Sequence, residues 1–161
     1  MLFNRTNINF DLDIKINNEP IERVKTFNFL GLTITDKLDW KQHIDNLGKK
    51  INRNIGILRR LKTQLPYATM KLLYFSLIHS HLLYMILIWG NDMDYILKKQ
   101  KQAIRIINNK HFLCHTEPLF KSSKILRLND LRTQSQLKLC RKYITGKLPD
   151  YFSNIELKKK Q

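Results

Sequence analysis

Three groups of side chains in this sequence have the chemical types that bind metal ions or take part in acid–base catalysis. Two of them are carboxylate pairs, Asp11 with Asp13 and Asp92 with Asp94. The third group consists of histidines and cysteines: His79, His81, His111, Cys114, His115 and Cys140. Thiolates and imidazoles bind Zn²⁺ in proteins when the fold brings four of them together.

The spacing of these groups favours structural roles. Asp11 and Asp13 alternate with apolar residues, which places both on the solvent side of a strand. Asp92 and Asp94 lie where a helix is expected to begin, and acidic side chains stabilise that end of a helix. The histidines and cysteines lack the two matched, closely spaced pairs of a zinc site. We therefore expect no catalytic residue, no metal ligand and no cofactor in this chain.

Positive charge is the strongest chemical signal. The 161 residues hold 29 Lys and Arg against 13 Asp and Glu, a formal net charge of +16. Residues 1–40 carry a net charge of −1, and residues 41–161 carry +17. Such an excess favours a polyanionic partner, either nucleic acid or an anionic membrane surface. The two cysteines, and an N-terminus without a signal-peptide core, favour an intracellular protein, nuclear or cytoplasmic, over a secreted one.

The first forty residues are predicted to form a small antiparallel hairpin or sheet. Apolar residues alternate from Ile8 to Ile16, so one face of this strand is expected to be buried. The segment 17–20 is typical of a turn, and a second strand is expected from about Lys25. The alternation changes phase at Gly31, which indicates a bulge or a close approach of the backbone to another group.

After residue 38 the apolar period becomes helical. Asp39 is expected to cap the helix, with Gln42 in the matching position of a capping box. The apolar residues then share one face: Trp40, Ile44, Leu47, Ile51, Ile55, Leu58 and Leu61. Lys49, Arg53 and Arg60 fall on the opposite face. This helix is therefore expected to pack through one side and to present cations on the other.

Three more helices are predicted, so the fold class is α+β and mainly α, with a bundle of about four helices. The second helix spans about 66–89 and is apolar on nearly every side. The third spans about 92–108, and its cations include Lys98, Lys99 and Arg105. Residues 111–118 are expected to form a loop, and the last helix is expected to span about 129–146.

The segment Leu72–Trp89 holds no formal charge and has the minimum length of a membrane-spanning helix. Polar side chains lie at its centre, where lipid penalises them most: Ser76, His79, Ser80 and His81. A helix buried in protein, with these side chains hydrogen-bonded, is therefore favoured, and no membrane partner is expected.

Five segments are informative when they are taken in order: "VKTFNFLGLTITDKLDWKQHIDNLGKKINRNIGILRRL", "LLYFSLIHSHLLYMILIWG", "QKQAIRIINN", "HTEPLFKSSKILRLNDL" and "KLPDYF". In this order they resemble the C-terminal part of a reverse transcriptase of the jockey-like, non-LTR retrotransposon family, and the resemblance extends over nearly the whole chain. The resemblance implies three parts. Residues 1–38 would be the trailing edge of the catalytic palm with its primer-grip hairpin, residues 39–110 a thumb-like helical bundle, and residues 111–161 a helical extension with a frayed tail.

The resemblance also implies which residues contact nucleic acid. Phe29, Leu30 and Gly31 match the primer-grip turn, which positions the end of the primer. The thumb of these enzymes holds the template–primer duplex, and cations bind its phosphates whatever the bases are. The candidate phosphate contacts are Lys49, Arg53, Arg59 and Arg60, followed by Lys98, Lys99 and Arg105.

The sequence departs from this family in its catalytic motif. The Asp-Asp pair that binds Mg²⁺ in the palm of these polymerases does not occur in residues 1–161, and two-metal nucleotidyl transfer needs those carboxylates. We therefore expect a fragment that binds an RNA template and a DNA primer, or an RNA–DNA hybrid, and is inactive alone. A separate polypeptide that contains the palm and fingers is the other partner that the resemblance allows. A transposon remnant without function, or a basic helical protein associated with membranes, is the alternative.

Overall fold

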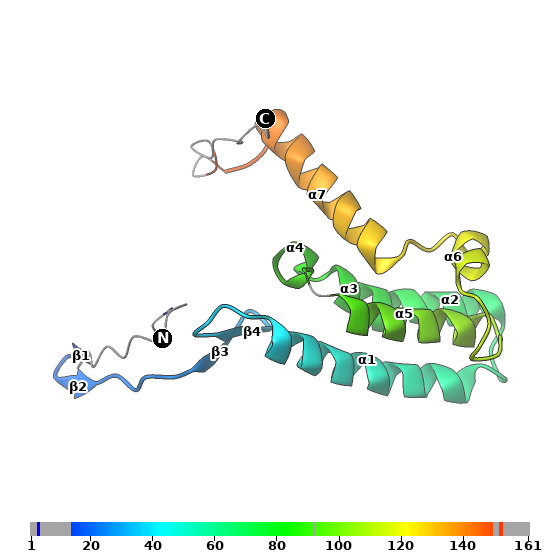
Figure 1. Ribbon diagram of the computed structural model, residues 1–161, viewed down its shortest axis with the longest axis horizontal. Helices are drawn as coiled ribbons and strands as arrows, with labels where there is room; N and C mark the ends of the chain where they lie inside the picture. The colour runs from blue at the N-terminus through cyan, green and yellow to red at the C-terminus, as the bar shows by residue number, and fades with distance from the viewer. Residues whose placement is uncertain (1–2, 4–13, 92, 150–151, 153–161) are drawn as a thin grey trace.

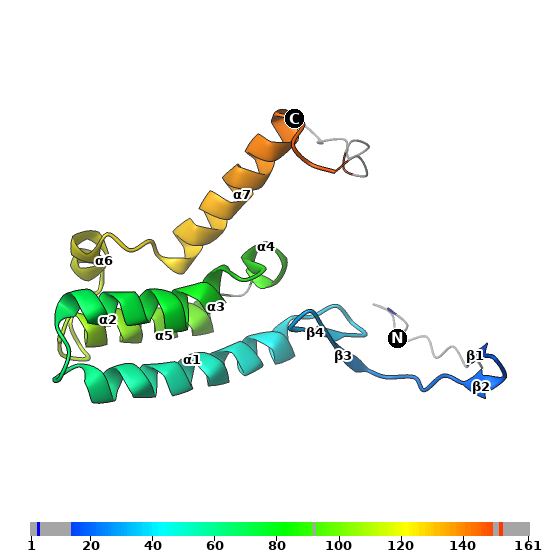
Figure 2. The same cartoon turned by 180° about the vertical axis from the view of Figure 1, so that it is seen from behind.

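The computed structural model describes residues 3, 14–91, 93–149 and 152. In this part of the chain, two antiparallel hairpins precede a set of helices (Figure 1 and Figure 2). The predicted fold class, α+β and mainly α with a small antiparallel unit first, is confirmed. The described helices are more numerous than the four expected, because one predicted helix is broken and one helix, α6 (Glu117–Ser123), lies between the predicted loop and the predicted last helix.

The two hairpins are separate two-stranded units. The first joins β1 (Lys15–Ile16) to β2 (Glu19–Pro20), and the second joins β3 (Thr26–Phe29) to β4 (Leu32–Thr35). Leu30 and Gly31 connect β3 to β4 with φ angles of +47° and +79°. Positive φ at both central residues is typical of the two-residue turns that match the twist of a hairpin. The change of phase at Gly31 is therefore a reversal of the chain. Of the two predicted alternatives, the bulge is wrong, and the backbone of Gly31 approaches the ring of Tyr84.

Burial in the hairpins differs from the prediction made from alternation. Ile14 and Ile16 are exposed, as are both phenylalanines of β3, because no second layer formed by the described residues covers these strands. The rest of the predicted first strand lies outside the described residues. In β4, Leu32, Thr33 and Thr35 are buried, since this strand packs against α1. The β3–β4 hairpin thus packs on α1 through strand β4.

The first helix, α1 (Lys41–Leu61), has the predicted apolar face. Its buried apolar residues are Ile44, Leu47, Ile51, Ile55 and Leu58, while Trp40 and Leu61 are partly buried at the two ends. The predicted capping box is wrong, because the residue that precedes the helix is Trp40. Asp39 instead accepts a hydrogen bond from the backbone N–H of Lys41 at 3.3 Å.

The predicted second helix is irregular. It comprises α2 (Tyr67–Tyr74), the π-helical segment η1 (Phe75–His79), α3 (Ser80–Leu83) and a short α4 (Ile86–Trp89). The break lies at Met85, whose φ is +49°. The indole N–H of Trp89 donates to the carbonyl oxygen of Tyr84 at 2.8 Å and so stabilises the turn. In the described part of the chain, no helix combines the length and the hydropathy that crossing a bilayer requires.

Three helices complete the structure: α5 (Asp94–Ile107), α6 (Glu117–Ser123) and α7 (Leu128–Ile144). The bounds of α5 and α7 agree closely with the prediction, whereas α6 falls at the end of the predicted loop. Helices α1, α2 and α5 pack on one another around a shared core. Helix α7 packs on α3, α4 and α5 through its N-terminal end and then projects away from the core (Figure 1 and Figure 2).

A buried amide connects these helices. Gln100 on α5 is fully buried, and its Nε2 donates to Tyr74 Oη and to the carbonyl oxygen of Leu126, both at 3.0 Å. Its Oε1 accepts from the backbone N–H of Leu128 at 2.9 Å. Burial raises the pKa of Tyr74 to about 12, so this hydroxyl stays protonated. Gln100 therefore satisfies polar groups of α2 and of the start of α7 within the core.

A candidate anion-binding cleft

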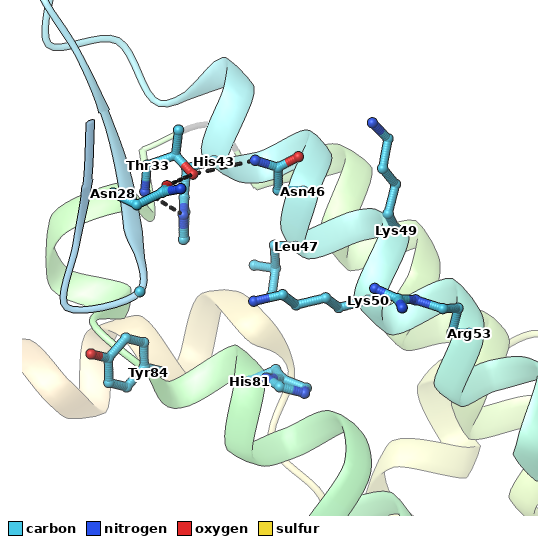
Figure 3. Close-up of a pocket in the computed structure, with 11 residues that line it drawn as sticks. Asn28, Thr33, His43, Asn46, Leu47, Lys49, Lys50, Arg53, His81 and Tyr84 are labelled. Carbon is cyan, nitrogen blue, oxygen red and sulfur yellow. Dashed lines mark hydrogen bonds between the residues drawn. The ribbon is translucent and has the colours of Figure 1, made fainter. Parts of the chain in front are cut away.

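A cleft of about 420 Å³ lies between the turn of the β3–β4 hairpin, the N-terminal half of α1 and the end of α3 (Figure 3). Three segments line it. The hairpin provides Asn28, Gly31 and Thr33. Helix α1 provides His43, Asn46, Leu47, Lys49, Lys50 and Arg53. The third wall consists of His81 and Tyr84.

Hydrogen bonds to Thr33 hold the hairpin against α1. The backbone N–H of Thr33 donates to His43 Nδ1 at 3.4 Å. Its hydroxyl donates to Asn28 Oδ1 at 2.9 Å and accepts from Asn46 Nδ2 at 3.3 Å. Three side chains from two elements thus converge on one buried threonine, which fixes strand β4 relative to the helix.

Tyr84 holds the turn from the opposite side. Its hydroxyl donates to the carbonyl oxygen of Leu30. A Cβ added at Gly31 would lie 3.7 Å from Cε1 of the tyrosine ring, so the turn already lies in contact with that ring. The positive φ of Gly31 is a conformation that residues with a side chain rarely adopt. Tyr84 therefore anchors the turn at the mouth of the cleft, while Thr33 of β4 bonds to α1.

Three cations of α1 give the cleft its charge. Lys49, Lys50 and Arg53 are exposed, and none of them forms an ion pair with a described carboxylate. Among the described residues that line the cleft, none is Asp or Glu. Figure 3 shows Lys50 extending from α1 toward the space between the hairpin turn and His81, with Arg53 beside it and Lys49 pointing away from the hairpin. A concave surface lined by positive charges attracts anions.

His43 is uncharged at neutral pH. Burial, with a smaller contribution from the charge of Lys50, lowers its pKa from the ordinary value of 6.5. The neutral ring is also what the geometry requires, because Nδ1 accepts the hydrogen bond of Thr33. The ring lies 6.1 Å from that of Trp89, between centroids. Protonation of His43 would add a charge beside Lys50 and remove an acceptor, so it opposes docking of the hairpin.

We expect the protein to lose stability as the pH falls through about 6.5. The unfolded chain binds a proton at His43 more readily than the folded chain, so acid favours unfolding, and stability is full only above the unfolded pKa. Burial also lowers the pKa of His79, which adds to the effect. The measurement is the midpoint of urea unfolding between about pH 8 and about pH 5.

The matched variant is His43→Asn, whose amide oxygen provides an acceptor without a titrating ring. Its midpoint should depend less on pH than that of the unaltered chain, with His79 responsible for what remains. An unchanged pH dependence would show that His43 does not limit stability in acid.

The structure divides the predicted nucleic-acid-binding residues into separate places. Gly31, Lys49 and Arg53 line the cleft, whereas Phe29 and Leu30 are exposed and are not among the described residues that line it. Arg60 is exposed further along α1. Arg59 and Arg105 line a second cleft. Lys98 and Lys99 line neither cleft, and Lys99 Nζ lies 5.2 Å from the centre of the Tyr95 ring.

The sequence interpretation missed several residues of the cleft: His43, Asn46, Lys50, His81 and Tyr84. Lys50 had a signal, because it lies in the same cationic helix. His81 was expected to be hydrogen-bonded in a buried helix, but it is half-buried and faces the cleft. Tyr84 contacts a residue 54 positions earlier, and no local pattern indicates such a contact.

The candidate metal ligands do not converge. In the described part of the chain, no three His, Cys, Asp or Glu side chains lie together as a metal site would need. Cys140 is exposed on α7, and Cys114 lies in the segment before α6. Asp11, Asp13 and Asp92 lie outside the described residues, and Asp94 is in the first turn of α5, as predicted.

Comparisons with protein-family models, with curated proteins and with solved structures give no match. The resemblance to reverse transcriptases therefore stays a prediction from the sequence. The geometry and charge of the cleft are the basis for assigning a function.

Proposed function

We propose that this chain binds the phosphate backbone of nucleic acid through the cleft, and that it does so without catalysing a reaction. One observation carries the proposal: Lys49, Lys50 and Arg53 line a concave surface, and none of the described residues that line it is acidic. The hydrogen bonds of Thr33 and Tyr84 hold the walls of this surface in place. Lys and Arg side chains bind phosphates by charge, whatever the base sequence.

The distribution of cations along α1 favours an extended polyanion over a small anion. Lys49, Arg53 and Arg60 follow one side of the helix, and at 1.5 Å per residue they extend over about 16 Å. The phosphates of one strand advance by about 3.4 Å along a duplex axis. A strand of nucleic acid can therefore contact all three cations at once, whereas a single small anion contacts only one end of the row.

The preferred ligand in this proposal is an RNA–DNA hybrid. The resemblance of residues 24–61 to the primer-grip and thumb region of a reverse transcriptase supports this choice. On this basis the chain is a thumb fragment with the trailing edge of the palm, and Mg²⁺ and the catalytic carboxylates belong to the part of the palm that residues 1–161 lack. The exposed phenylalanines of β3 offer a surface to such a palm.

We expect affinity for the hybrid to fall steeply with salt. Each phosphate contact contributes about −0.7 to −0.9 to the slope of log K against log salt concentration, because binding releases counterions. Four contacts, from Lys49, Lys50, Arg53 and Arg60, give a slope of about −3, which means a roughly 60-fold loss between about 50 and about 200 mM salt. Fluorescence anisotropy of a labelled hybrid measures this slope. A flat salt dependence, or no binding at the lower salt concentration, would refute the proposed function.

A further inference from the structure

A second cleft, of about 320 Å³, lies at the C-terminal ends of α1 and α5. Its lining consists of Arg59, Lys62, Gln102, Arg105, Ile106, Lys110, His111 and Phe112. At about 100° per residue, Arg59 lies about 180° around α1 from Lys50. The two clefts therefore open on different sides of the same helix.

The second cleft combines positive charge with an exposed aromatic ring. Of the lining residues that the structure describes, four are Arg or Lys and none is Asp or Glu. Phe112 is 71% exposed although it forms part of the wall. The rings of His111 and Phe112 lie side by side, with centroids 4.4 Å apart and planes inclined by 47°. An apolar ring left in water beside phosphate-binding groups has no evident role in stabilising the fold.

Hydrogen bonds hold the aromatic wall in place. Arg105 Nε donates to the carbonyl oxygen of Cys114 at 2.7 Å, which ties the segment after α5 back to the helix. The backbone N–H of Lys110 donates to the carbonyl oxygen of Arg105 at 2.9 Å, and that of Cys114 to the carbonyl oxygen of His111 at 3.0 Å. Hydrogen bonds therefore hold the backbone on both sides of Phe112, which keeps this segment beside the end of α5.

We propose that the second cleft binds one unpaired nucleotide of a single-stranded nucleic acid. The base stacks on Phe112, and the flanking phosphates contact Arg59, Lys62 and Lys110. The cleft volume of about 320 Å³ lies at the lower end of the range of about 300–1,000 Å³ for sites that bind small organic ligands. Stacking on aromatic side chains next to a cationic groove is how proteins bind single strands without sequence preference.

This inference rests on the proposed function, which makes nucleic acid the partner. It assigns single-stranded nucleic acid to the second cleft, whereas the proposed function assigns a duplex to the first. Bases inside a duplex are stacked on their neighbours, so a duplex offers no free base to Phe112. The first cleft therefore takes the paired region, and the second takes an unpaired extension that leaves it.

A membrane surface is the competing partner, because Phe112 and Leu113 are adjacent and each is 71% exposed. Insertion into lipid would use both side chains, since both are apolar and accessible. The cleft uses only Phe112, because Leu113 is not part of its lining. The concave arrangement of Phe112 among cations favours a planar anionic ligand, and the two residues provide a direct way to separate the partners.

The test measures binding of the full chain to three fluorescent probes: a blunt RNA–DNA hybrid, the same hybrid with a short single-stranded extension, and the isolated single strand. Phe112→Ala should weaken binding of the two probes with unpaired bases by roughly tenfold, the loss expected from one stacked base. It should leave binding of the blunt hybrid unchanged. Phe112→Trp should restore binding, because the larger ring also stacks.

Leu113→Ala is the matched control, since it removes an equally exposed apolar side chain next to Phe112, and it should bind all probes normally. Equal binding of unpaired bases by Phe112→Ala and the unaltered chain would overturn the inference. Equal losses of affinity in Phe112→Ala and Leu113→Ala, together with binding to phosphatidylserine vesicles, would also overturn it and would identify a membrane contact. If the blunt hybrid does not bind but the single strand binds through Phe112, the proposed function of the first cleft is refuted and the inference about the second cleft is supported.

Discussion

Reversing the charges of Lys50 and Arg53 together, as Lys50→Glu with Arg53→Glu, should abolish detectable binding of an RNA–DNA hybrid at about 100 mM salt. Each charged hydrogen bond to phosphate contributes about 1.5–3 kcal/mol, so losing two of them weakens binding by at least roughly 100-fold. Repulsion between the new carboxylates and the phosphates adds to this loss. Anisotropy titration of a labelled hybrid measures the effect. Both side chains are exposed, so the fold is expected to tolerate the change.

The control for net charge is Lys98→Glu with Lys138→Glu. It changes the total charge by the same amount, and both lysines are exposed on helices that place them in neither cleft. This variant should keep most of the affinity. Equal losses in the two variants would mean that the overall charge of the protein, and not the cleft, determines binding.

Replacing Gln100 by Leu should have the largest effect on stability, with a loss of about 3–6 kcal/mol in the free energy of unfolding. Leu fills a similar volume, but it leaves the hydroxyl of Tyr74, the carbonyl of Leu126 and the N–H of Leu128 without their partner. Each buried polar group left unsatisfied costs about 1–3 kcal/mol. Because domains are stable by only about 5–15 kcal/mol, this one substitution brings the protein close to unfolding.

Urea denaturation followed by circular dichroism measures the loss. Gln102→Leu makes the same chemical change two residues further along α5, at a half-buried position, and should alter stability by less than about 0.5 kcal/mol. Similar unfolding midpoints for Gln100→Leu and the unaltered chain would show that the amide does not connect the helices as described.

The sequence predicted best those elements whose burial is periodic. In α1, five buried apolar residues recur at helical spacing, so the sequence alone assigns Ile44 and Leu58 to the core. Gln100 could not be assigned in this way, because a glutamine in a basic helix is usually solvated. Its burial depends on partners on α2 and near the start of α7, more than twenty residues away in either direction. The exposure of strand β3 could not be predicted, since alternation of apolar residues shows which side chains share a face but not whether another element covers that face.

The candidate site was predictable in part. The cations of α1 follow from composition and spacing, but their division between two clefts does not. Arg59 and Arg60 are adjacent in sequence, yet they project about 100° apart around the helix, so only one of them lies on the side of Lys49 and Arg53. The approach of Tyr84 to the hairpin turn depends on the break at Met85, and a run of apolar residues gives no indication of that break.

The most direct test of the central claim is to label the lysines of the unaltered protein with an amine-reactive reagent, with and without a saturating RNA–DNA hybrid. Mass spectrometry then gives the extent of modification at each lysine. If the cleft binds the hybrid backbone, Lys49 and Lys50 become protected while Lys98 reacts as before. The same reactivity of Lys50 in both conditions, or equal protection of Lys98, would contradict the assignment of the cleft.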